Sequence, residues 1–98
     1  MKSISSLELQ ERLKDGKNVH IIDVREDFEV AQGKIPEAKH ISLGEIPNSI
    51  GKLDKNKHYY MVCQGGGRSA SACEFLSSQG YDVTNVAGGM SAWQGEIE

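Results

Sequence analysis

The sequence predicts an α/β fold built around a parallel sheet, and three observations carry this prediction. Two runs, at residues 19–24 and 59–63, are apolar on both faces, as expected of strands buried between two layers. Each run is followed by a helical segment, so strands alternate with helices. Polar side chains follow both runs directly, at the edge where ligands bind in sheets of this kind.

The first half of the chain is predicted to hold one clear helix, one clear strand and three shorter elements. Ser5 and Glu8 resemble a capping box, so we expect a helix at about residues 6–15, ended by Gly16. The strand at 19–24 comes next. The shorter elements are a helix at 26–32 closed by Gly33, a brief strand at Ile41 and a helical turn at 46–50.

The second half repeats the strand–helix–strand order. A helix is expected at 69–79, directly after the strand at 59–63 and its loop, and Gly80 is placed to cap it. A last strand is expected at 82–86. With no internal repeat and no linker in the sequence, all of these segments belong to one domain spanning residues 1–98.

The charge and the apolar content of the sequence argue against some classes of binding partner. The net charge of −3 is mild and the lysines and arginines are scattered, which argues against a nucleic-acid or anionic-membrane surface. No apolar run is long enough to span a bilayer, and residues 1–5 lack the apolar core of a signal peptide. We therefore expect a cytoplasmic protein whose two cysteines are reduced.

Cys63 is the candidate nucleophile because of the residues around it. A thiolate at the mouth of a helix is stabilised by backbone N–H groups and by the positive helix end. Three successive glycines allow φ > 0 conformations that turn N–H groups inward, and Arg68 adds a positive charge. Such a loop can hold a thiolate, a persulfide or the oxyanion of a sulfur donor. The residues between strand and helix are Gln64, Gly65, Gly66, Gly67 and Arg68.

Two simpler interpretations stand beside this one. Cys63 alone would be a buried strand cysteine, and residues 65–67 alone would be a turn; it is their succession that indicates a functional site. Cys73 could be a resolving thiol, but its position on the apolar face of the helix favours core packing.

Four segments resemble the motifs of the rhodanese family, in the same order and spacing. Cys63 to Ser69 matches CxxGxRS, and Asp23-Val24-Arg25 matches DxR. Residues 33–38 are similar to GHIPGA and residues 88–93 to GGxxxW. The motifs span nearly the whole chain, so it is identified as a member of the rhodanese-like family. The resemblance implies a single-domain α/β fold with a central parallel five-stranded sheet flanked by helices on both faces.

The resemblance also implies a sulfurtransferase reaction. The thiolate of Cys63 would take a sulfane sulfur from thiosulfate or a persulfide and pass it to cyanide, a thiol or a protein cysteine. Neither a metal nor an organic cofactor is implied. Asp23 and Arg25 would support the loop, through a charge pair of Asp23 with Arg25 or Arg68. The substrate-binding residues would be Gln64, Gly65, Gly66, Gly67, Arg68 and Ser69.

The chain departs from the family pattern at two positions. Lys34 replaces the usual histidine of GHIPGA, and Glu37 replaces its second glycine. Both positions can alter the rim of the pocket or only the local turn, and no catalytic role is assigned to either. The three histidines show no ligand spacing, so a metal site has little support; they are His20, His40 and His58.

Two other functions remain open on the sequence. Cysteine phosphatases and arsenate reductases of related fold use a longer CxxxxxR loop, whereas here four residues separate Cys63 from Arg68, a cradle better suited to a sulfur atom. The chain could also be a persulfide carrier or binding module that serves one protein partner. Activity with small donors would separate an enzyme from such a carrier.

Overall fold

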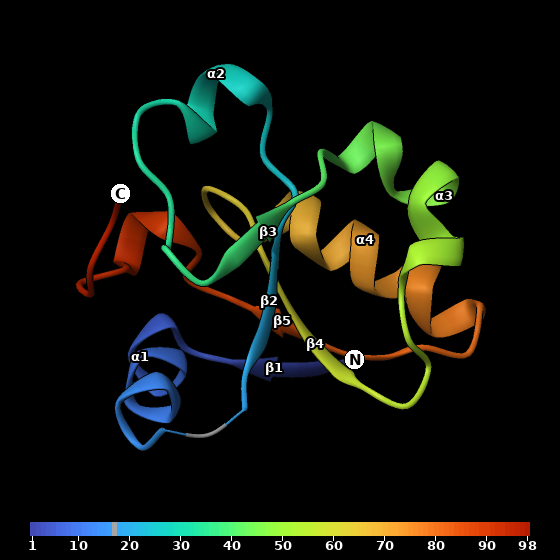
Figure 1. The fold of residues 1–98 in the computed structure, drawn as a ribbon, viewed down its shortest axis with the longest axis horizontal. Helices are drawn as coiled ribbons and strands as arrows, with labels where there is room; N and C mark the ends of the chain where they lie inside the picture. Colours follow the sequence, from blue (N-terminus) through green and yellow to red (C-terminus); the bar gives the residue numbers. More distant parts are fainter. Residues whose placement is uncertain (17) are drawn as a thin grey trace.

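A five-stranded parallel sheet forms the centre of the structure, a computed structural model that describes residues 1–16 and 18–98 (Figure 1). The strand order is β1-β5-β4-β2-β3, and every neighbouring pair is parallel. This order makes β4 the central strand, with β2 on one side and β5 on the other. The strands are β1 Lys2–Ile4, β2 His20–Asp23, β3 Ala38–His40, β4 His58–Val62 and β5 Asp82–Val86.

Helices cover both faces of the sheet, as expected. In Figure 1, α1 and the C-terminal η3 lie on one face, α3 and α4 on the other, and α2 lies beyond the ends of β2 and β4. The α-helices are α1 Ser6–Lys14, α2 Asp27–Val30, α3 Ile46–Ser49 and α4 Gly67–Ser78. Short 3₁₀ turns are η1 Leu43–Glu45, η2 Ile50–Lys52 and η3 Met90–Ala92.

Two apolar clusters fill the spaces between the sheet and its helices. Successive strand residues point to opposite faces, so Ile21 packs toward α1 while Ile22 packs toward α4. Met61 and Val62 of β4 divide in the same way. This double burial is the reason that both runs have apolar residues on both faces. The parallel pairing places the carboxyl ends of β2, β4 and β5 at one edge.

Helix α1 begins where the capping pattern predicts. The Ser5 side chain accepts a hydrogen bond from the Glu8 amide at 3.0 Å, and the Ser5 amide donates to Glu8 Oε1 at 3.2 Å. The helix ends at Lys14, one residue before the predicted end. None of the helices in the described part of the chain is long and apolar enough to cross a bilayer.

Besides shifts of one or two residues at several element ends, three differences from the predictions stand out. The expected strand at Ile41 lies at Ala38–His40; the Ile41 amide still donates to Asp23 O at 3.0 Å, so Ile41 continues the ladder beyond the strand. Helix α4 begins at Gly67 rather than residue 69 because the left-handed Gly66 precedes it. Strand β1 matches no predicted segment: its three residues lie at the sheet edge and are mostly exposed, so they carry no apolar pattern.

Candidate active site

Cys63 follows β4 directly and lies beneath the loop that leads into α4. Cys63 is 1% exposed to solvent. The Gly66 amide donates to Cys63 Sγ at 3.0 Å, and the Ser69 hydroxyl lies 3.3 Å from the same sulfur. The loop is held from the opposite side, because the Met90 amide donates to the Cys63 carbonyl at 2.9 Å. The thiol is therefore surrounded by donors inside a fixed loop.

Gly66 is the glycine on which the loop depends. Its φ is +101°, and a Cβ at this position would run into the carbonyl of Ala87. Gly65 and Gly67 have ordinary φ values and open space around the position of a Cβ. Of the three glycines that allow φ > 0 conformations, Gly66 alone adopts one, and this single left-handed residue suffices to turn the chain from β4 into α4.

The environment of Cys63 favours the thiolate. Burial by itself raises the pKa of the Cys63 thiol, but hydrogen bonds from the Ser69 hydroxyl and from the amides of Ser69, Gly66 and Gly65 outweigh it. The pKa consequently lies below its ordinary value of 9.0. A thiol with a lowered pKa, placed at the start of a helix, is the condition for a cysteine nucleophile.

Asn85 of β5 positions the Ser69 hydroxyl. Ser69 Oγ lies within hydrogen-bond distance of Asn85 Oδ1, at 2.5 Å, and Asn85 Nδ2 donates to the Gly66 carbonyl at 3.2 Å. Both side chains are buried. Asn85 thus ties the loop residue that contacts the sulfur to the neighbouring strand, and it was absent from the predicted site.

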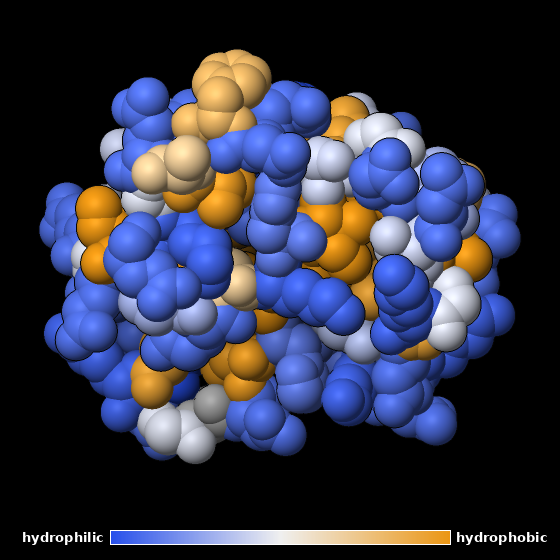
Figure 2. Space-filling view, turned by 45° about the horizontal axis from the view of Figure 1, so that its top comes forward, coloured by the Kyte–Doolittle hydropathy of each residue, from blue (hydrophilic) through white to orange (hydrophobic). Residues whose placement is uncertain are grey.

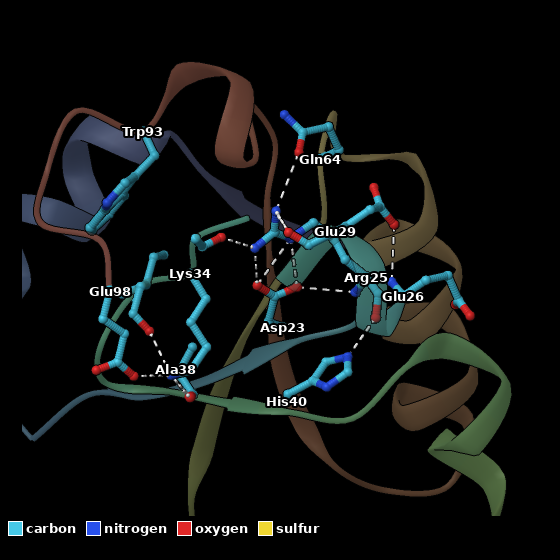
Figure 3. Close-up of polar contacts among 12 residues, drawn as sticks. Asp23, Arg25, Glu26, Glu29, Lys34, Ala38, His40, Gln64, Trp93 and Glu98 are labelled. Atoms are coloured by element: carbon cyan, nitrogen blue, oxygen red, sulfur yellow. Dashed lines mark hydrogen bonds and ion pairs between the residues drawn. The ribbon is translucent and has the colours of Figure 1, made fainter. Parts of the chain in front are cut away.

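Asp23 and Arg25 form the expected charge pair. Arg25 Nη2 donates to Asp23 Oδ2 at 2.9 Å, and Arg25 Nε contacts both carboxylate oxygens at 3.1 Å. Figure 3 shows the guanidinium between Asp23 and Gln64, to whose side-chain oxygen Arg25 Nη1 donates at 3.4 Å. The Arg25 side chain also donates to Gly33 O at 2.8 Å. The pair therefore joins the end of β2 to the Cys63 loop.

Arg68 takes a partner that the sequence did not suggest. Its Nη1 and Nη2 donate to Glu29 Oε1 and Oε2 of α2, at 2.6 and 2.8 Å. This two-pronged ion pair lowers the pKa of Glu29 to about 2. Arg68 is thus bound to Glu29 rather than to Asp23. Because Glu29 is negatively charged, it largely neutralises the positive charge that was predicted beside the sulfur.

The departures from the motif pattern act on the local turn. Lys34 Nζ donates to the carbonyls of Ile35, Pro36 and Ala38 and lies 3.0 Å from Glu98 Oε1. Figure 3 shows this cluster apart from the Arg25 network. Lys34 therefore fastens the turn before β3 to the C-terminal residues and does not point to Cys63.

The remaining candidates lie elsewhere in the fold. Cys73 is fully buried on α4 in the same apolar cluster as Cys63, in agreement with core packing. Each histidine belongs to a strand, and among residues 1–16 and 18–98 no group of three His, Cys, Asp or Glu side chains could hold a metal ion.

Sequence reasoning missed Glu29 and Asn85 for different reasons. Asn85 lies near the carboxyl end of β5, so the rule that pointed to Asp23 and Cys63 could also have found it. Glu29 lies on a helix of four residues and meets an arginine 39 positions away, and only the packing of α2 against the loop reveals the contact.

Comparisons with known proteins agree with this geometry. The sequence model of the family described as "Rhodanese-like domain" matches residues 5–96. "Putative sulfurtransferase YtwF" of Bacillus subtilis is 47% identical over 98 residues, which are 100% of this chain and 95% of that protein. "Sulfurtransferase" of Allochromatium vinosum is 37% identical over 95% of this chain and 88% of its own length.

A solved structure extends the likeness to three dimensions. The crystal structure of a rhodanese-like domain protein from Staphylococcus aureus has a TM-score of 0.95 and 48% identity, and covers 100% of this chain and 97% of that one. The likeness in sequence and in fold thus covers nearly the whole chain. This chain belongs to the rhodanese-like domain family.

Proposed function

We propose that this protein is a rhodanese-type sulfurtransferase that carries a sulfane sulfur as a persulfide on Cys63. The observation that carries the proposal is the ring of donors around one thiol with a lowered pKa. The family membership and the two similar proteins named as sulfurtransferases support the same class of reaction. Asp23 and Arg25 support the loop rather than contact the sulfur.

The reaction has two steps of displacement at sulfur. The Cys63 thiolate attacks the sulfane sulfur of thiosulfate, the S–S bond of the donor breaks, and sulfite leaves with the electron pair. A second thiophile, such as cyanide or a thiolate, then attacks the outer sulfur and releases the Cys63 thiolate. The donors that stabilise the thiolate would also stabilise the persulfide anion formed between the steps.

The orientation of Arg68 disfavours the phosphatase alternative. A loop that encircles phosphate or arsenate needs its arginine turned toward the bound oxyanion. Here both terminal nitrogens of Arg68 are occupied by Glu29 on the outside of the loop. A generic aryl phosphate should therefore not be turned over by Cys63.

Intact mass measurement tests the proposal. The protein is incubated with thiosulfate or with an organic persulfide, freed of excess donor and weighed. One added sulfur is expected, lost on treatment with cyanide or a thiol and absent from Cys63→Ser. Absence of loading from every donor would refute the proposal. Repeated turnover with small donors indicates an enzyme, and loading without turnover indicates a sulfur carrier that serves a protein partner.

We also propose that the protein acts in the cytoplasm, which is a reducing compartment. The cycle requires Cys63 to return to a free thiolate after each transfer, and glutathione and thioredoxin keep cytosolic thiols in that state. Both cysteines are free in the structure.

A further inference from the structure

The charges around the Cys63 loop cancel in pairs. Arg25 and Arg68 bring two positive charges to the loop, and each guanidinium is bound by one carboxylate, that of Asp23 or Glu29. The Asp23–Arg25 pair is buried, whereas the Arg68 side chain is 36% and that of Glu29 18% exposed. The pair that a donor can meet from solvent is therefore Arg68 with Glu29.

Glu29 is held in place and remains ionised. Besides both nitrogens of Arg68, its Oε1 accepts a hydrogen bond from the Glu26 amide at 3.0 Å. With its pKa lowered to about 2, chiefly by the bond from Arg68, it carries a full negative charge at any pH at which the protein works. The carboxylate therefore stays charged beside the Cys63 loop.

Glu29 also lines a hollow beside the loop. A cavity of about 240 Å³ is walled by Arg25, Phe28, Glu29, Gln32 and Gln64. Phe28 is 71% exposed. Figure 2, with the top of the molecule turned toward the viewer, shows apolar side chains standing out among hydrophilic ones over the region of α2. A donor that approaches Cys63 along this side meets a carboxylate, side-chain amides and an aromatic ring.

We propose that Glu29 is a specificity-determining residue, which disfavours dianionic donors such as thiosulfate and leaves the site suited to persulfides of low charge. The inference rests on the proposed function and names the donor class of the same site. Glu29 neutralises Arg68, so an incoming anion gains no net Coulomb attraction from the pair; the attraction that is lost is twice as large for a dianion as for a monoanion and zero for a neutral donor. The apolar ring of Phe28 offers a contact for the carbon part of an organic persulfide.

Both donors deliver the same atom but arrive with different charges. With a neutral persulfide RSSH, the Cys63 thiolate attacks the outer sulfur, the S–S bond of the donor breaks, and RS⁻ leaves with the electron pair. The outer sulfur and its proton remain on Cys63. Thiosulfate brings two negative charges past Glu29 and releases sulfite.

Steady-state kinetics with three donors test the role of Glu29. The donors are thiosulfate, the monoanion benzenethiosulfonate and the persulfide of N-acetylcysteamine, whose electrophilic form RSSH is neutral, each with cyanide as acceptor. Glu29→Gln keeps an acceptor for Arg68 but removes the charge. We expect its KM for thiosulfate to fall roughly tenfold with kcat nearly unchanged, with a smaller fall for benzenethiosulfonate and none for the neutral persulfide.

Two variants and one measurement serve as controls. Glu29→Asp keeps the carboxylate and should keep the wild-type preference, and Glu11→Gln removes the same charge from an exposed position on α1 and should change nothing. In the wild type, added salt should leave the KM for thiosulfate nearly unchanged, because the Arg68–Glu29 pair carries no net charge to be screened. This last measurement does not depend on the folding of any variant.

The outcomes separate the inference from the function on which it rests. A change of equal size for all three donors in Glu29→Gln would show a purely structural residue, and a wild-type KM for thiosulfate that rises with salt would show an attractive site. Either result overturns the inference while sulfur transfer stands. If no donor loads the wild-type protein, the proposed function itself is wrong.

Discussion

The two cysteines are about equally buried, but the pKa values of their thiols are shifted in opposite directions. Cys63 is 1% and Cys73 0% exposed, and both belong to the apolar cluster between the sheet and α4. The pKa of Cys63 lies below 9.0, whereas burial raises the pKa of Cys73 to about 12.

The difference comes from the backbone around each sulfur. Cys63 directly follows a strand and faces the free N–H groups at the start of α4, with the Ser69 hydroxyl beside it. Cys73 lies inside α4, where backbone N–H groups are already used within the helix. Burial without donors suppresses ionisation, and burial with donors supports it, so exposure alone is a poor guide to a reactive cysteine.

Replacing each cysteine gives the largest expected contrast. Cys63→Ser should abolish sulfur loading, because a serine hydroxyl stays protonated and cannot hold a sulfane sulfur. Cys73→Ala should load one sulfur as the wild type does. Intact mass after incubation with donor measures both. If the two folded variants lost loading equally, Cys73 would have to take part in the transfer.

Distorting the donor ring should come next in size. Gly66→Ala places a Cβ against the Ala87 carbonyl at φ +101°, so the loop must shift, at a cost of about 1–3 kcal/mol, and loading should fall strongly. Gly65→Ala, with open space at its Cβ, is the matched control and should keep the wild-type stability and sulfur loading. Chemical denaturation measures the stability, and intact mass measures the loading. Equal behaviour of the two variants would contradict the role of Gly66.

Removing one donor should move the pH dependence of Cys63. In the wild type, the rate of alkylation by iodoacetamide should rise with pH through a midpoint below 9.0, as the thiolate forms. Ser69→Ala removes the hydroxyl beside the sulfur, so the midpoint should move up and the rate at neutral pH should fall roughly tenfold. An unchanged midpoint would show that the backbone amides suffice. Ser71→Ala, an exposed serine on the same helix, is the control.

The smallest effect concerns the stability of the core. Cys73→Ala removes one buried sulfur and should lower the free energy of unfolding by about 1–2 kcal/mol. Urea denaturation of the wild type and the variant measures the change. A variant as stable as the wild type would mean that the surrounding side chains close the space. Alkylation of Cys73 should be undetectable while the protein remains folded, whereas Cys63 reacts.

The sequence predicted the structure well where contacts between residues close together in the chain determine it. The capping box of α1 and the glycine that ends α4 were predicted to within a residue or two, because each depends on local contacts. The Cys63 loop was found for the same reason, since the strand, the turn and the helix follow one another without interruption. Strand β5 was also predicted with its observed bounds.

The sequence by itself determined the strands that are buried on both faces and predicted Cys63 as the nucleophile. It left the partner of Asp23 open between Arg25 and Arg68, and the structure pairs Asp23 with Arg25, two residues away. Only the tertiary structure decided that Arg68 is bound by Glu29, that Asn85 holds Ser69, and that β1 closes the sheet beside β5. These contacts join residues 39, 16 and more than 80 positions apart. The residue types fix the charge and the hydrogen-bonding groups of each side chain. Which partner each group binds depends on which elements the folded chain packs together.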